Sequence, residues 1–194
     1  KGGQPVKTSL EEISVGSFSP DGKSVAFNRN NSFTFNWRRY RGGTQGRIGI
    51  FNFETKDYSE LPTGREQNYF PMWVGDNIYY VSDKVEGTHN LYQYNLKSKK
   101  ADQLTKFSDA DVRMPSTDGK TVVFERDGIL YGYDIASKVT KAIQPRVATD
   151  STLIRSGMRK LGNNVSNMAL SPSGKRLVVE ARGELAHRRV ALPA

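Results

Sequence analysis

The sequence has no cysteine and only two histidines among its 194 residues. The absence of cysteine excludes a disulfide framework, a thiolate nucleophile and every metal site that needs cysteine ligands. The two histidines, His89 and His187, leave few groups for metal binding or for a proton relay. No apolar run approaches the ~18 residues with which a helix crosses a bilayer, and no secretory apolar segment opens the chain. The chain begins at Lys1 rather than Met, which indicates a processed or excised piece.

The composition is that of a folded domain with a basic balance. Hydrophobic residues make up 36% and charged residues 25%, which fits one sizeable core or two small ones and excludes a fibre or a disordered tail. The net charge is +9, and nearly all of the excess lies in residues 135–194. Such a region fits either an anionic partner or a solvated rim beside an acidic neighbour. Because the basic residues are dispersed, the solvated rim is favoured.

Helical periodicity is also scarce, and strand-like runs take its place. The runs are rich in β-branched and aromatic residues, and Gly, Asp, Asn, Ser or Pro bounds each of them. They lie at 24–27, 47–53, 78–81, 91–94, 121–124, 129–133 and 176–179. The sequence therefore predicts an all-β protein without substantial helix.

A short phrase repeats between these runs. Ser-Pro-Asp-Gly-Lys at 19–23 returns as Ser-Thr-Asp-Gly-Lys at 116–120 and as Ser-Pro-Ser-Gly-Lys at 171–175, with a degenerate copy at 74–77. Each copy lies between two runs, as a tight hairpin turn would. The interval is close to the ~40–50 residues of a propeller blade, a small sheet that buries its faces by stacking on its neighbours.

The repeats predict a β-propeller segment of about four four-stranded antiparallel blades. The predicted blades cover about 12–62, 69–105, 111–144 and 164–192, and residues 5–9 are predicted as the outer strand of a preceding or closing blade. The packed sheet faces are predicted to contain Phe27, Ile50, Tyr80, Val81, Leu91, Val123, Phe124, Leu130, Val178 and Val179. The last blade shows three strands, so residues 5–9 either close a ring of four or belong to a larger ring.

Many propellers share such strands and turns, but three stretches of this sequence are more specific. The first is Trp-Arg-Arg-Tyr-Arg-Gly-Gly-Thr at 37–44 with the strand at 47–50; the second joins 75–83 to 90–92; the third joins 171–175 to 180–183. In these stretches the chain resembles the tricorn protease family, and the resemblance covers roughly residues 10–183. The tail at 186–190 departs from the family's strand.

The resemblance implies a non-catalytic N-terminal propeller ahead of a serine-peptidase region. It also implies that the four predicted blades are an open segment of a six-bladed ring, which is favoured over a closed ring of four. It implies a role in gating or docking peptides, with peptides or the peptidase domain of the same protein as partners, and a homo-oligomer as a further option. No part of the sequence matches the family's catalytic serine, histidine and acid, so no catalytic residue is assigned. The alternative is a stand-alone propeller that acts as a protein-interaction scaffold. The location stays open between a bacterial cytoplasm and periplasm, with the periplasm favoured.

Other motifs give no cofactor or metal site. Gly-Lys-Ser at 22–24 and Gly-Lys-Thr at 119–121 resemble the end of a phosphate-binding loop, but Ser17 and Met114 stand where that loop needs glycine. No Gly-x-Ser-x-Gly elbow accompanies His89. Asp109 and Asp111 could supply carboxylates to calcium, but the further oxygen ligands and the glycine of a calcium loop are missing. We expect a polar loop between blades there.

The segment 28–46 contains more side chains suited to binding a ligand, arginines and aromatic residues, than any other segment of the sequence. A two-residue hairpin could join the flanking strands, yet the chain spends about eighteen residues there. Arg38, Arg39 and Arg41 are the candidate peptide-binding residues, because a guanidinium offers a planar fork of donors to a carboxylate. Trp37 and Tyr40 are the candidate structural anchors. Two other interpretations stay open: an insertion that only packs on the propeller, which the composition alone favours over peptide contact, and a surface for single-stranded nucleic acid, which is the least favoured.

Overall fold

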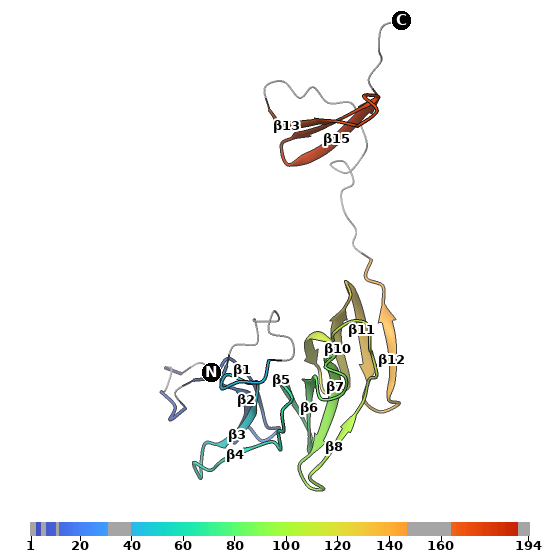
Figure 1. Ribbon diagram of the computed structural model, residues 1–194. Helices are drawn as coiled ribbons and strands as arrows, with labels where there is room; N and C mark the ends of the chain where they lie inside the picture. Colours follow the sequence, from blue (N-terminus) through green and yellow to red (C-terminus); the bar gives the residue numbers. More distant parts are fainter. Residues whose placement is uncertain (1–2, 5–6, 11, 31–39, 147–163, 190–194) are drawn as a thin grey trace, which may run out of the picture. The chain divides into compact units, whose positions relative to one another are not determined.

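The computed structural model describes residues 3–4, 7–10, 12–30, 40–146 and 164–189. It divides the chain into two units, Lys1–Pro145 and Arg146–Ala194, and each is described by itself. All regular elements of the described residues are β-strands, so the predicted all-β class is confirmed (Figure 1). None of these residues forms a helix that could cross a membrane.

The first unit contains three four-stranded antiparallel sheets, in each of which the strands follow chain order (Figure 1). The first sheet contains β1 (Val15–Phe18), β2 (Ser24–Asn28), β3 (Ile48–Asn52) and β4 (Tyr58–Glu60). The second contains β5 (Asn68–Val74), β6 (Asn77–Ser82), β7 (Asn90–Asn95) and β8 (Lys100–Gln103). The third contains β9 (Arg113–Thr117), β10 (Thr121–Arg126), β11 (Ile129–Asp134) and β12 (Val139–Ile143).

The second unit contains a three-stranded antiparallel sheet. Its strands are β13 (Val165–Leu170), β14 (Arg176–Ala181) and β15 (Glu184–Arg189). Three strands are what the sequence predicts for this repeat. The predicted outer strand at 5–9 falls partly outside the described residues, and its described part, 7–9, forms no strand. The assignment of all four sheets to one ring, and of six blades to that ring, stays a prediction.

The repeated phrase forms the turn between the first two strands of each sheet. Gly22, Gly119 and Gly174 have φ values of +70°, +88° and +67°, a backbone region that residues with a side chain avoid. At the third-sheet turn, Asp118 Oδ1 accepts the N–H groups of Lys120 and Thr121 at 2.9 and 2.8 Å. These hydrogen bonds hold the pKa of the Asp118 carboxyl below its usual value. The predicted hairpin turns are thereby confirmed.

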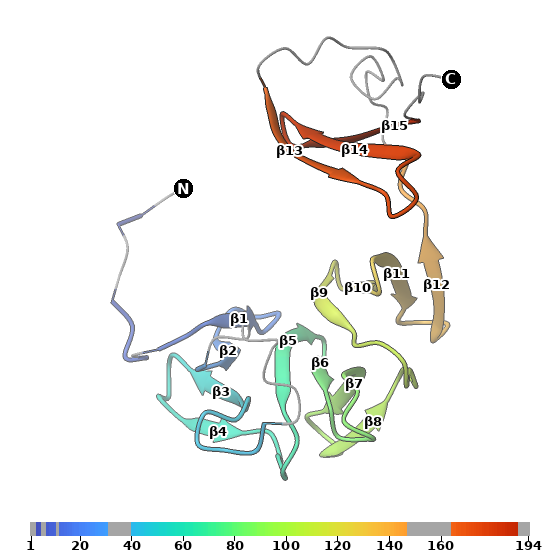
Figure 2. The same ribbon diagram turned by 45° about the horizontal axis from the view of Figure 1, so that its top comes forward.

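The core of the first unit contains three apolar clusters. Two of them form layers, one on each face of the second sheet, which lies between the other two sheets (Figure 2), and the third lies within the first sheet around Val25, Phe27 and Phe51. The layer shared with the first sheet contains Ala26, Ile48, Leu61, Ile78, Tyr80, Tyr92 and Tyr94. The layer shared with the third sheet contains Met72, Tyr79, Val81, Leu91, Val112, Val122, Phe124 and Tyr133. Sheet stacked on sheet around buried apolar layers is the packing of propeller blades.

The predicted core residues divide into three groups. Phe27, Tyr80, Val81, Leu91 and Phe124 are buried, whereas Ile50, Val123 and Val179 are half-buried.

Leu130 and Val178 are exposed at 40% and 39%, so the prediction is wrong for these two. Leu130 points to the face of β11 opposite Tyr133, and it is Tyr133 that packs on the second sheet. Val178 lies beside His187, on a face of the three-stranded sheet that stays accessible among the described residues of the second unit.

Candidate functional site

The long insertion joins two strands that are direct neighbours. β2 pairs with β3 from Ser24 opposite Asn52 to Asn28 opposite Ile48, as the sequence predicts for these runs. The candidate residues Trp37, Arg38 and Arg39 lie outside the described residues. The description resumes at Tyr40, so residues 40–46, here called the return limb, carry the structural information on the insertion.

The return limb is held by the second sheet rather than by its own. Gln67, which is fully buried, accepts a hydrogen bond from the backbone N–H of Gly46 through Oε1 at 2.7 Å. Through Nε2 the same side chain donates to the carbonyl oxygen of Tyr40. Gln45 Nε2 donates to the carbonyl oxygens of Gly64, at 3.1 Å, and of Glu66. The limb is therefore fixed at both of its ends to the segment that leads into β5.

An ion pair with a buried carboxylate adds to this attachment. Arg41 Nη1 lies 2.9 Å from Asp83 Oδ2, and the Asp83 side chain has no exposed surface. Asp83 Oδ1 accepts the backbone N–H of Gln67 at 2.7 Å, so both carboxylate oxygens have partners. Arg41 Nη1 also donates to the carbonyl oxygen of Tyr40 at 3.0 Å, and 27% of its side chain is exposed. The structure thus brings the candidates Arg41 and Tyr40 together.

Two aromatic rings continue the network beyond Gln67. The Tyr69 hydroxyl donates to Gln67 Oε1 at 2.7 Å. Burial raises the pKa of Tyr69, and the negative charge of Asp83 adds to this effect. The Tyr69 ring lies 6.2 Å from the ring of the buried His89, whose Nδ1 is 3.5 Å from Asp111 Oδ1. Asp111 Oδ1 also accepts the backbone N–H of His89 at 2.9 Å, which gives the carboxylate a role in holding the loop.

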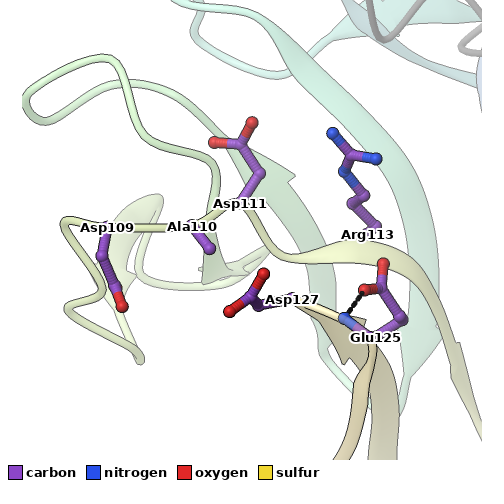
Figure 3. A pocket seen from close by; sticks show the side chains of 7 residues that line it. Asp109, Ala110, Asp111, Arg113, Glu125 and Asp127 are labelled. Carbon is purple, nitrogen blue, oxygen red and sulfur yellow. Dashed lines mark hydrogen bonds between the residues drawn. The ribbon is translucent and has the colours of Figure 1, made fainter. Parts of the chain in front are cut away.

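A pocket of about 360 Å³ lies next to Asp111 at the end of the third sheet (Figure 3). Its lining is formed by Asp109, Ala110, Asp111, Arg113, Glu125, Asp127 and Gly128. Figure 3 shows the carboxylates of Asp109 and Asp111 pointing apart. Glu125 Oε1 accepts the backbone N–H of Gly128 at 2.6 Å. No group of three or more His, Asp or Glu side chains among the described residues is placed to hold a metal ion.

One residue of this pocket's lining, Asp109, is bound by an arginine. Arg126 forms an ion pair with Asp109, and its guanidinium carbon lies 4.3 Å from the centroid of the Phe107 ring. The hydrogen bond from Arg126 holds the pKa of the Asp109 carboxyl below its usual value. The pocket is acidic and polar, and its chemistry suits a cationic group.

Sequence reasoning misses Asp83, Gln67 and Tyr69. Asp83 follows a predicted strand, where an aspartate is most simply interpreted as an ordinary turn residue. Its partner Arg41 is 42 positions away, on an insertion of another sheet. No periodicity or motif in one sequence carries that pairing.

The family model for the tricorn protease N-terminal beta propeller domain matches residues 1–139 of the chain. The tricorn protease homolog of Saccharolobus solfataricus is 37% identical over 99 residues, 51% of this chain and 9% of that protein. The tricorn protease of Thermoplasma volcanium is 31% identical over 120 residues, 62% of this chain and 12% of that protein. The chain thus spans about a tenth of the length of these curated relatives.

Solved structures show the same fold. The crystal structure of the tricorn protease matches with a TM-score of 0.52 and 19% identity, over 92% of this chain and 21% of that one. The putative TolB of Agrobacterium tumefaciens matches with a TM-score of 0.54 and 15% identity, over 69% of this chain and 50% of that one. At these identities the likeness is one of fold.

Proposed function

The chain belongs to the family of tricorn protease N-terminal β-propeller domains, and from this premise we propose that it docks peptides, or gates their passage, for a serine-peptidase region of the same protein. The relatives named tricorn protease support the peptidase part of this proposal. The chain itself contributes recognition and no catalytic group. Its own turnover of unstructured peptides is accordingly expected to be undetectable.

The observation that carries the docking role is the anchored return limb. Strands that pair directly need a turn of a few residues, and a longer loop in a compact domain is commonly functional or disordered. Here the limb is fixed by the buried Gln67 and Asp83, at the cost of burying polar and charged groups. The use of buried polar groups for this attachment supports a function that depends on a fixed position of the insertion.

The proposed peptide contacts are Arg38, Arg39 and Arg41, with Trp37 and Tyr40 as anchors. Arginine recognises a carboxylate through two parallel hydrogen bonds, and paired charge increases their strength. The proposed ligand group is the C-terminal carboxylate of a peptide, a group that every peptide substrate or product carries. For Arg41, one nitrogen already serves Asp83 and Tyr40, so a peptide would use the other edge of the guanidinium.

Short peptides with free and amidated C-termini provide the test. We expect the wild-type chain to prefer the free carboxylate, and the variant Arg38→Ala/Arg39→Ala/Arg41→Ala to lose that preference. The matched control is Lys97→Ala/Lys99→Ala/Lys100→Ala, which removes the same charge from the turn after β7 and from the first residue of β8. Equal binding in all combinations would leave the insertion a structural element. A preference for oligonucleotides would favour the nucleic-acid alternative.

The second candidate function is a scaffold that binds other proteins. It is favoured by the apolar far face of the third sheet, where Leu130, Val139 and Ile143 are exposed at 40%, 44% and 38%. A partner protein or a second copy of the chain would cover this face. The length of the encoded protein separates the two candidates, since a peptidase region downstream supports docking for proteolysis.

A further inference from the structure

We propose that Asp83 is the positioning residue of the insertion: its buried carboxylate orients the Arg41 guanidinium and holds the return limb on the second sheet. The claim that Asp83 prepares Arg41 for peptide recognition rests on the proposed docking function. The claim that Asp83 holds the return limb does not rest on it, so separate experiments can refute each claim.

The first argument is the environment of the charge. A buried carboxylate is costly unless it is paired and hydrogen-bonded, and Asp83 satisfies both conditions through Arg41 and the Gln67 N–H. Breaking such a pair leaves a buried charge without compensation. The conformation in which Arg41 reaches Asp83 is therefore strongly preferred over conformations in which the limb swings away.

The second argument is that Asp83 reaches the limb by two routes. It binds Arg41 directly, and it holds the backbone of Gln67, whose side chain binds Tyr40 and Gly46 at the two ends of the limb. A single carboxylate thus fixes the strand end, the linker before β5 and the insertion together. Supporting groups of this kind are what keep a binding side chain within a fraction of an ångström of its working position.

The third argument is the geometry of the guanidinium. Asp83 and the Tyr40 carbonyl oxygen both occupy Nη1 of Arg41. Two fixed acceptors on one nitrogen set the plane of the fork, and the opposite edge of that plane, Nε and Nη2, is the edge that a peptide carboxylate would use. Orienting this edge before binding removes the entropy loss that a free arginine side chain would suffer.

Arg47, the residue that directly follows the insertion, offers a matched comparison. Its Nη1 lies 3.4 Å from Glu60 Oε2, with side chains 55% and 36% exposed. Exposed pairs of this kind contribute little, because water screens them. Arg47→Ala therefore removes one arginine and one exposed ion pair next to the insertion without touching the buried attachment.

Hydrogen exchange at the Gly46 and Gln67 amides tests the limb directly in the full chain. We expect Asp83→Asn to speed exchange at both amides by about tenfold or more, because a hydrogen-bonded charge is lost. Arg47→Ala should leave both rates near wild type. Unchanged exchange in Asp83→Asn would overturn the positioning role.

Peptide binding tests the consequence for recognition. We expect Asp83→Asn to weaken binding of a free-carboxylate peptide by about tenfold and to leave its amidated form unaffected. Arg41→Lys, which keeps the charge but loses the planar fork, should behave like Asp83→Asn. A wild-type chain without carboxylate preference would refute the docking function and leave the exchange result standing. A wild-type preference that survives Asp83→Asn would refute the positioning role.

A variant without any unpaired charge guards against loss of folding. If Asp83→Asn does not fold, Arg41→Gln/Asp83→Asn replaces the ion pair by two neutral groups that can bond to each other. For this variant we expect retained folding, loss of carboxylate preference and faster exchange at Gly46 than in Arg47→Ala. Wild-type preference in the double variant would overturn the proposal.

Discussion

Two valines in the third sheet test whether its far face is open. Val122 on β10 faces the second sheet and has no exposed surface, whereas Val139 on β12 is 44% exposed on the opposite face. Substituting each by alanine removes the same atoms from opposite sides of one sheet. The comparison therefore isolates burial from the chemistry of the substitution.

The magnitudes follow from the surface that each side chain has lost. At Val122, two methylene equivalents at about 0.8 kcal/mol each and a cavity left between the two sheets give about 2–3 kcal/mol. At Val139, less burial and no enclosed cavity give below about 1 kcal/mol. Both positions lie in strands, so the loss of strand propensity affects both and largely cancels from the difference.

Urea unfolding followed by tryptophan fluorescence measures both variants. The tryptophans, Trp37 and Trp73, both belong to the first unit, so the signal reports the unfolding of that unit. An unchanged slope against urea is required for the midpoints to be compared as free energies. Equal losses in the two variants would refute the reasoning, since they would mean that another sheet covers the far face in solution.

Three further predictions concern single groups in the first unit. Gly119→Ala should lower the free energy of unfolding by about 1 kcal/mol, because φ is +88° there, whereas Gly43→Ala should have a smaller effect in the same urea assay. Burial and the hydrogen bond to Glu60 raise the pKa of Tyr58 to about 12. The stability that this shift contributes is therefore complete below the pKa of about 10 that tyrosine has in the unfolded chain, and it is lost as the pH rises through 12. Tyr58→Phe should remove this dependence of the free energy of unfolding on pH, measured between about pH 10 and 12. The bonded carboxyls Asp109 and Asp118 have lowered pKa values, so their contribution should be present above pH 4 and disappear on further acidification, as acid titration of the unfolding midpoint would show.

The turns could be predicted from the sequence because their cause is local. A positive φ needs glycine, and a carboxylate two or three residues from backbone N–H groups can bind them wherever the chain lies. The phrase around Gly119 contains both requirements within five residues. From the regular return of this phrase the strand order of each sheet follows, because short turns join antiparallel neighbours.

The buried faces were harder to predict, because the strands are apolar on both sides. Alternation identifies the core face only where the other face is polar. In β10 both Val122 and Val123 are apolar, and in β11 both Leu130 and Tyr133 are candidates. Which of each pair is covered depends on the neighbouring sheet. The structure places Val122 and Tyr133 against the second sheet, and this choice is absent from the strand's own pattern.

The site illustrates the same limit at longer range. The arginines and aromatics at 37–41 are visible in the sequence as a composition, and composition alone allows packing, peptide binding or nucleic-acid binding. What separates these roles is the surroundings of each guanidinium. A carboxylate buried on another sheet gives Arg41 a fixed orientation, whereas Arg47 pairs with the exposed Glu60 in a contact that water screens. The consequence is that charge in this insertion acts by placement, so variants that keep the charge and alter the placement, such as Arg41→Lys, are more informative than variants that remove it.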